Sequence, residues 1–217
     1  MPITLYEAAT ENDKQQASGK PPTSVVTGKV VGNMDLINEG KVLVRVPSLD
    51  QEVWARLAGP GAGSGAGLFY VPRTDDEVLI ALSDNELGDA YIIGGLWSSQ
   101  ASPPASSGLE ATTKRILKTG IQSGVGHVVE FDDGTGQSIT ITTVTKQKMV
   151  MDTEKIELST TGGQVKITLG LTDQSISIQA LKSIEIKSQG TLKLSAAQIE
   201  IAGQAQTKIT GGMVMIN

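Results

Sequence analysis

The sequence predicts an all-β protein in which a small barrel is followed by a stack of short strands. Segments rich in β-branched residues and bounded by turn residues recur through the N-terminal part of the chain. The C-terminal part repeats apolar–polar–apolar triplets at intervals of about 8 residues. Aromatic residues make up only 3 % of the 217 residues, whereas 25 are glycine, which suits narrow layers better than a thick core.

The chain divides into four segments. Residues 1–23 are polar and are expected to form an extension with little structure of its own. Residues 24–98 contain the predicted barrel strands, and residues 99–113 are small, polar and proline-bearing, as in a linker. Residues 114–217 hold the triplets. The predicted barrel strands are 23–31, 41–46, 52–57, 77–82 and 90–97.

The triplets predict strands and exclude a helix. On a helix, the two isoleucines of Ile184-Glu185-Ile186 would lie about 200° apart, whereas on a strand they share one side and Glu185 points away. One such strand cannot offset its ordering entropy of about 1–2 kcal/mol per residue, so the repeats must stack into a β-helix or prism. The period leaves open whether one chain or three identical chains close it. Val150 is an apolar exception at an outward position.

Composition argues against several classes of function. The net charge is −5 and Lys and Arg form no cluster, so nucleic acid is not an expected partner. Cysteine is absent, which removes disulfides and thiolate metal sites. No apolar run is long enough for a transmembrane helix. The first residues lack a basic segment followed by an apolar one, so no cleaved signal peptide is expected.

Three features that could indicate chemistry are predicted to be structural. His127 has no second histidine and no nucleophile arrangement beside it in the sequence. Asp132-Asp133-Gly134 lacks the further acidic ligands of a calcium loop and is typical of a tight turn. Gly59–Gly67 is not followed by the Lys and Ser or Thr of a phosphate loop, so a loop between strands is expected. We therefore expect no catalytic, cofactor-binding or metal-binding residues.

The order of segments 41–47, 53–58, 59–67, 69–72, 76–81 and 91–97 resembles the OB-fold domain of a known family. That family comprises the central spikes of contractile phage tails and the valine–glycine repeat spikes of type VI secretion and extracellular injection systems. Residues 126–134, followed by the triplets, resemble the start of the family's trimeric β-helix. The similarity covers roughly residues 24–217.

The resemblance implies an N-terminal OB-fold barrel followed by an intertwined homotrimeric β-helix needle. It also implies a separate hub protein at the OB end and a proline–alanine–alanine–arginine (PAAR) type cap at the other end. The histidines that bind iron in certain phage spikes have no counterpart here. The apolar residues expected in the trimer core are Ile139, Ile141, Met149, Met151, Ile156, Leu158, Val165, Ile167, Ile176, Ile178, Ile184, Ile186, Leu192, Leu194, Ile199, Ile201 and Ile209.

The C-terminal residues Met213, Val214, Met215, Ile216 and Asn217 are expected to dock the cap, although Met213 and Met215 also suit a last core layer. The implied role is mechanical: the spike pierces the target envelope on sheath contraction and meets the target membrane only transiently. Its place would be a virion tail baseplate or an extracellular or cytoplasmic injection particle. The alternatives are a nucleic-acid-binding OB module and a β-helix enzyme, which the scarcity of basic and aromatic residues and the 8-residue spacing disfavour.

Overall fold

The computed structural model describes residues 25–32, 40–83, 89–105, 107–120 and 125–216. The chain forms two compact units, Met1–Gly108 and Leu109–Asn217, each of which is described by itself. Apart from one short helix, every regular element in the described ranges is a β-strand, so the predicted all-β class is confirmed. The predicted extension at 1–23 lies outside the described residues.

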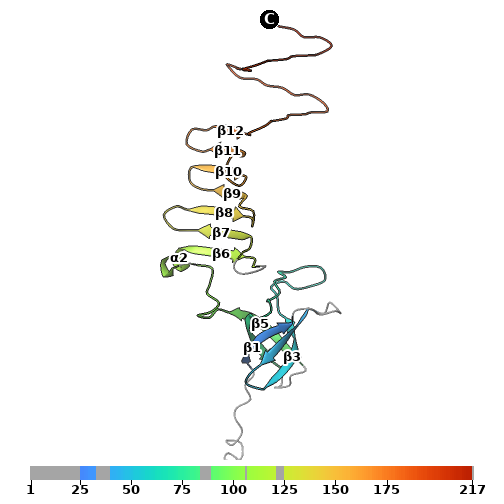
Figure 1. The fold of residues 1–217 in the computed structure, drawn as a ribbon, viewed down its shortest axis with the longest axis vertical. Coiled ribbons are helices and arrows are strands. Elements are labelled where there is room, and N and C mark those ends of the chain that lie inside the picture. Colours follow the sequence, from blue (N-terminus) through green and yellow to red (C-terminus); the bar gives the residue numbers. More distant parts are fainter. Residues whose placement is uncertain (1–24, 33–39, 84–88, 106, 121–124, 217) are drawn as a thin grey trace, which may run out of the picture. The chain divides into compact units, whose positions relative to one another are not determined.

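The N-terminal unit contains a closed five-stranded barrel (Figure 1). Around the barrel the strands follow the order β1-β2-β3-β5-β4, and all neighbours are antiparallel except β3 and β5. All five strands were predicted, with bounds that differ by at most two residues from those observed. The strands are β1 (Val25–Gly32), β2 (Lys41–Val46), β3 (Gln51–Leu57), β4 (Glu77–Leu82) and β5 (Ala90–Leu96).

The barrel core follows from the two-residue alternation of its strands. In β2, Val42, Val44 and Val46 point inward and are buried, whereas their neighbours are more exposed. Mostly β-branched side chains fill this narrow interior, and no aromatic ring is among the described buried residues. The other fully buried core residues with large side chains are Val30, Val78, Ile80 and Ile92.

Gly28 occupies an inward position of β1 at which the barrel has no room for a side chain. A Cβ at Gly28 would overlap the side chain of Val44 and would lie 2.7 Å from the Cδ1 atom of Ile80. The glycine therefore allows the facing strands to approach closely across the barrel interior.

The glycine-rich segment 59–67 folds into a small hairpin between β3 and β4. The backbone N–H of Gly63 donates to the carbonyl of Ala66 at 3.0 Å, and the N–H of Ala66 donates back at 3.3 Å. Gly67 has a φ of 118°, and a Cβ there would lie 2.8 Å from the Cα of Ala62. The loop expected from the sequence is thus a hydrogen-bonded turn that requires glycine at position 67.

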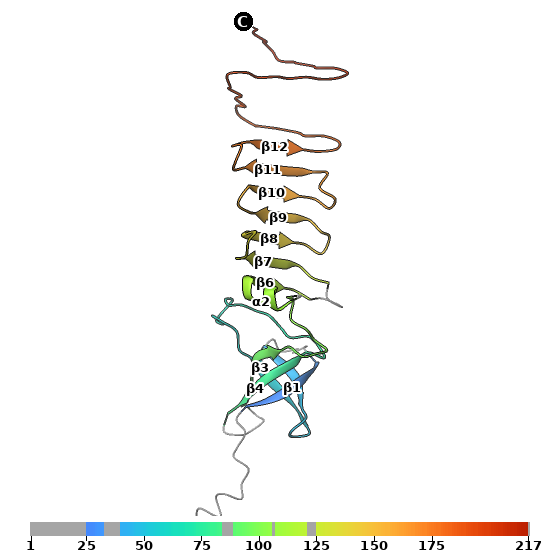
Figure 2. The same cartoon turned by 90° about the vertical axis from the view of Figure 1, so that its left-hand side faces the viewer.

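The C-terminal unit is one antiparallel sheet of seven strands in chain order, from β6 to β12 (Figures 1 and 2). Each strand pairs with the strand that follows it in the chain, so the sheet is a meander. This pairing contradicts the open alternative of a single-chain coil, in which parallel strands several repeats apart would pair. The strands are β6 (Lys114–Lys118), β7 (Val128–Asp132), β8 (Ser138–Thr142), β9 (Lys148–Met151), β10 (Lys155–Ser159), β11 (Lys166–Gly170) and β12 (Ile176–Gln179).

Side-chain carboxylates stabilise some of the turns between these strands. Between β7 and β8, the N–H of Gly134 donates to Oδ1 of Asp132 at 2.9 Å, which confirms the turn predicted at Asp132-Asp133-Gly134. Between β9 and β10, Oδ1 of Asp152 accepts the N–H groups of Glu154 and Lys155, each at 2.8 Å. These hydrogen bonds, first that of Glu154, lower the pKa of Asp152 below its ordinary value of 3.8. Helix α2 (Gly108–Thr113) precedes the sheet and lies within the segment expected to be a linker.

Residues 180–216, where further stacked strands were predicted for a trimer, differ from the sheet in the single chain. No strand occurs there, and the trace continues beyond β12 in wide passes, without a hydrogen-bonded neighbour (Figures 1 and 2). The triplets in this segment still alternate apolar and polar residues. No two of them, however, pair as neighbouring strands. A strand needs a partner for its backbone groups, and the described residues of the chain supply none for this segment.

We expect Gly28→Val to destabilise the barrel by about 1–3 kcal/mol, because its side chain would overlap Val44 and Ile80. Urea unfolding followed by tryptophan fluorescence measures this effect, since both tryptophans, Trp54 and Trp97, lie in the N-terminal unit. Thr27→Val, one position away and outward-facing, is the matched control and should change the stability by less than about 0.5 kcal/mol. A Gly28→Val variant as stable as its control would contradict this description of the barrel interior.

We expect the Asp152 turn to lose its stabilising effect in acid. Because the folded-state pKa lies below 3.8, the carboxylate stabilises the sheet above that pH and stops doing so as pH falls through the folded-state value. The unfolding midpoint of the wild type should therefore exceed that of Asp152→Asn at pH 6, and the gap should narrow below pH 3.8. Far-ultraviolet circular dichroism reports the midpoints, and a gap independent of pH would rule this effect out.

Candidate subunit interface

The sheet of the C-terminal unit has two chemically different faces. Registered pairs such as Val129↔Ile141 and Ile141↔Met149 align apolar side chains in rows across the strands. We call this side the apolar face. All but one of its strand positions carry an apolar side chain, and the exception is Arg115. The apolar face comprises Arg115, Leu117, Val129, Phe131, Ile139, Ile141, Met149, Met151, Ile156, Leu158, Ile167, Leu169, Ile176 and Ile178.

The apolar face is open to solvent. Ile141 is 41 % exposed, Leu158 47 % and Ile178 51 %. No residue of the described part of this unit is buried, so the sheet has no core of its own. These apolar residues were predicted to point inward, and no described residue of the same chain lies on that side to enclose them. Exposed apolar area of this extent marks an interaction surface.

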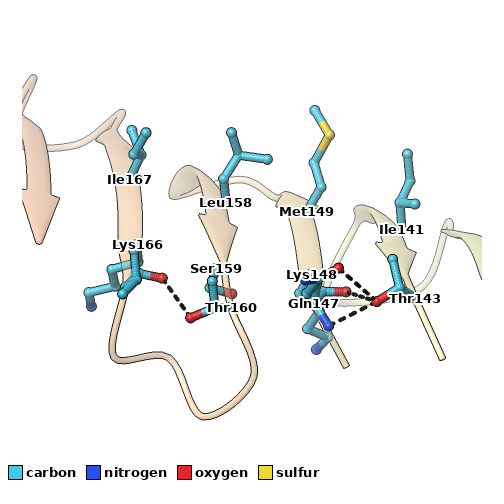
Figure 3. Close-up of a pocket in the computed structure, with 11 residues that line it drawn as sticks. Ile141, Thr143, Gln147, Lys148, Met149, Leu158, Ser159, Thr160, Lys166 and Ile167 are labelled. Atoms are coloured by element: carbon cyan, nitrogen blue, oxygen red, sulfur yellow. Dashed lines mark hydrogen bonds between the residues drawn. The ribbon is translucent and has the colours of Figure 1, made fainter. Parts of the chain in front are cut away.

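A groove of about 380 Å³ runs across the middle of the apolar face (Figure 3). Ile141, Met149, Leu158 and Ile167 come from four successive strands and point to the same side in Figure 3. The hydroxyl of Thr143, which accepts the N–H of Gln147 at 3.1 Å, belongs to a turn at the margin of this groove. The floor is hydrocarbon and the polar groups lie at the margin, which suits an apolar partner better than a polar ligand.

The opposite face, which we call the polar face, carries ion pairs. Nζ of Lys114 lies 3.2 Å from both Glu110 and Glu130 and 3.8 Å from Asp132, so it joins helix α2 to β7. The hydrogen bonds to Glu130 and then Glu110 raise the pKa of Lys114. The polar face also contains Ile116 and the predicted outward exception Val150. Its charged side chains suit solvent, which leaves the apolar face as the one that requires cover.

The predicted core residues fall into three groups. Those from Ile139 to Ile178, except Val165, lie on the apolar face, and Val165 lines its groove just before β11. Those beyond β12 lie in the segment without strands and are exposed in the single chain, so their place in a trimer core stays a prediction. This last group consists of Ile184, Ile186, Leu192, Leu194, Ile199, Ile201 and Ile209.

Five members of the apolar face were not predicted from the sequence: Arg115 and four apolar residues, Leu117, Val129, Phe131 and Leu169. Val129 and Phe131 flank Glu130 as a regular triplet, and Ile167-Thr168-Leu169 forms another, so alternation could have identified them. Leu117 follows Ile116 directly, and two adjacent apolar residues do not reveal which of them faces the core.

The other residues considered for a catalytic, metal-binding or docking role do not come together in a site among the described residues. The backbone of His127 exchanges hydrogen bonds with Thr119, whose hydroxyl accepts its N–H at 2.8 Å, and the imidazole side is exposed. Among the described residues, no three His, Cys, Asp or Glu side chains are placed to hold a metal ion. Of the predicted docking tail, Met213, Val214, Met215 and Ile216 are at least half exposed, and Asn217 lies outside the described residues.

The barrel has its own exposed apolar group beside the glycine hairpin. Phe69, which follows the hairpin, is 76 % exposed, and Leu68 and Tyr70 on either side of it are about half exposed. Trp97, directly after β5, is 71 % exposed. Exposed aromatic side chains are enriched where proteins bind other proteins.

Comparison with known proteins concerns the barrel. Residues 26–97 match the family of type VI secretion system and phage-baseplate injector OB domains, which spans β1 to β5. No curated protein matches the chain. No helix in the described ranges is both long and apolar enough to cross a membrane. The barrel formed by residues 26–97 is therefore similar to the injector OB domains of the type VI secretion and phage-baseplate family, which supports a spike-type role for the chain in a tail or injection particle.

Proposed function

We propose that this chain is the central spike of a contractile tail or injection-system baseplate and that it works as a homotrimer. The observation that carries the proposal is the uncovered apolar face of a sheet that follows an injector OB domain. In the proposed trimer, the apolar faces of three chains meet around a common axis and the polar faces remain in solvent.

The energetics favour association. Full burial of a Val, Leu, Ile, Phe or Met side chain contributes about 1.5–3 kcal/mol, and the apolar face offers such a side chain at nearly every position. Their sum exceeds the entropic cost of association, which is about 4–15 kcal/mol. Two copies could also cover each other as a sandwich, and the resemblance to trimeric spikes favours three.

The trimer would also give residues 180–216 strand partners. Their triplets have the alternation of strands, and the chain itself supplies no neighbour for them. Strands from the other two copies would provide hydrogen-bonding partners and extend the shaft. The seven paired strands alone, at about 4.8 Å per strand, span about 30 Å, which matches the hydrocarbon thickness of a bilayer.

The remaining parts of the proposal concern partners. A separate hub protein would bind the barrel, for which Phe69 and Trp97 offer exposed aromatic contacts. A PAAR-type cap would bind the exposed tail around Met213 and Met215. The trimer would cross the target envelope on sheath contraction, as a mechanical element without a catalytic step and without nucleic acid as a partner.

The apolar face can be tested with two adjacent residues on opposite faces of β8. We expect Ile141→Lys to abolish or strongly weaken the trimer, because a buried unpaired charge costs about 3–5 kcal/mol for each copy. Thr140→Lys should leave the trimer intact, because Thr140 lies on the polar face. Native mass spectrometry and light scattering report the number of chains per particle.

If the chain worked alone, Thr140→Lys would be the more damaging of the two variants. The reason is that Ile141 is exposed and Thr140 is partly buried in a single chain. A monomeric or dimeric wild type, or equal effects of the two variants, would refute the proposed trimer.

Removal of residues 213–217 should abolish binding of a PAAR-type protein and leave the number of chains per particle unchanged. The reason is that the tail lies beyond the sheet, with Met213 and Met215 each 81 % exposed. Binding can be measured by interferometry with the immobilised cap protein. The matched control removes residues 1–20 at the other end. Unchanged cap binding by the shortened tail would place the docking surface elsewhere.

A further inference from the structure

Arg115 interrupts the apolar face at its first strand. It lies in β6 directly opposite Phe131 and on the same side as Leu117, and it is the only charged side chain among the strand positions of this face. A charge at the end of an otherwise apolar row needs a polar partner once that face is covered.

The contacts of Arg115 leave part of its guanidinium without a partner. Nη1 donates to the carbonyl oxygens of Thr112 and Lys114, at 3.3 and 2.8 Å. Among the described residues, Nε and Nη2 form no hydrogen bond, and no carboxylate lies within ion-pair distance of the guanidinium. The adjacent Lys114 differs sharply, because three carboxylates surround it on the polar face.

Threefold symmetry would bring three copies of this guanidinium to one end of the shaft core. Three like charges near a common axis repel one another unless an anion lies between them. A tetrahedral oxyanion on that axis presents three equivalent oxygens, one for each copy, and planar guanidinium groups bind such oxygens with paired N–H donors.

We propose that Arg115 forms an oxyanion-binding site for inorganic phosphate or sulfate, made by three copies at the β6 end of the shaft. The inference rests on the proposed trimer. The ion would neutralise the three charges and close the apolar interior at this end. One site per trimer requires one anion for three chains.

The experiment is calorimetric titration of the full-length chain with inorganic phosphate at constant ionic strength, with chloride as the reference anion. The number of chains per particle is measured in parallel by native mass spectrometry. We expect one phosphate per three chains, at least tenfold weaker binding by Arg115→Met, and an intermediate loss for Arg115→Lys, which keeps the charge but not the planar pair of donors. Lys148→Met removes a positive charge from the polar face of β9 and should bind phosphate within twofold of the wild type.

The outcomes separate the site from the trimer. A wild type that is trimeric but binds no phosphate, binds one per chain, or binds equally well as Arg115→Met overturns the site and leaves the trimer standing. A monomeric wild type overturns the proposed function itself. Should Arg115→Met not assemble, the wild-type stoichiometry and the Arg115→Lys titration decide: one ion per three chains with weakened binding supports the site, and any other combination overturns it.

Discussion

The structure depends on one constraint: a strand presents alternate side chains to opposite faces, and the C-terminal unit is a single layer. In the barrel, the same alternation is satisfied within the chain, because β1 pairs with both β2 and β4 and the sheet closes around Val30 and Ile80. The C-terminal sheet pairs only consecutive strands and never closes. Its apolar rows therefore have no counterpart within the chain, and the two units of one polypeptide differ in whether they complete their own core.

The register of strand pairing determines which side chains lie on the apolar face. Because the side-chain period is two, a slip of one residue in β10 would exchange Leu158 for Glu157 or Ser159 on the apolar face. Lys114 and Arg115 show the same effect with charges: they are adjacent in β6, yet one meets three carboxylates and the other meets Phe131 and Leu117. Carboxylates in the turns, such as Asp152, hold the strand ends at the lengths that keep this register.

Much of the fold could be predicted from sequence, because the signals are local. Alternating segments bounded by Gly, Pro and Asp indicated every barrel strand and the strands from β8 to β12. Adjacent apolar residues such as Ile116 and Leu117 did not reveal which of the two lies on the apolar face. Arg115 belonged to no sequence pattern that would place it on the apolar face. The segment 180–216 has the same triplets as the sheet but no strands. Pairing depends on a neighbour, and the alternation of a sequence does not say from which molecule that neighbour comes.

The chain order of the meander also determines how the sheet can form. Every pairing from β7 to β12 joins strands separated only by a short turn, so each new strand docks on an edge that its predecessor has just completed. Such a sheet can grow in the direction of synthesis without waiting for distant segments. Copies would then meet as preformed surfaces, and the free edge of β12 would be the point from which their remaining segments begin to wind together.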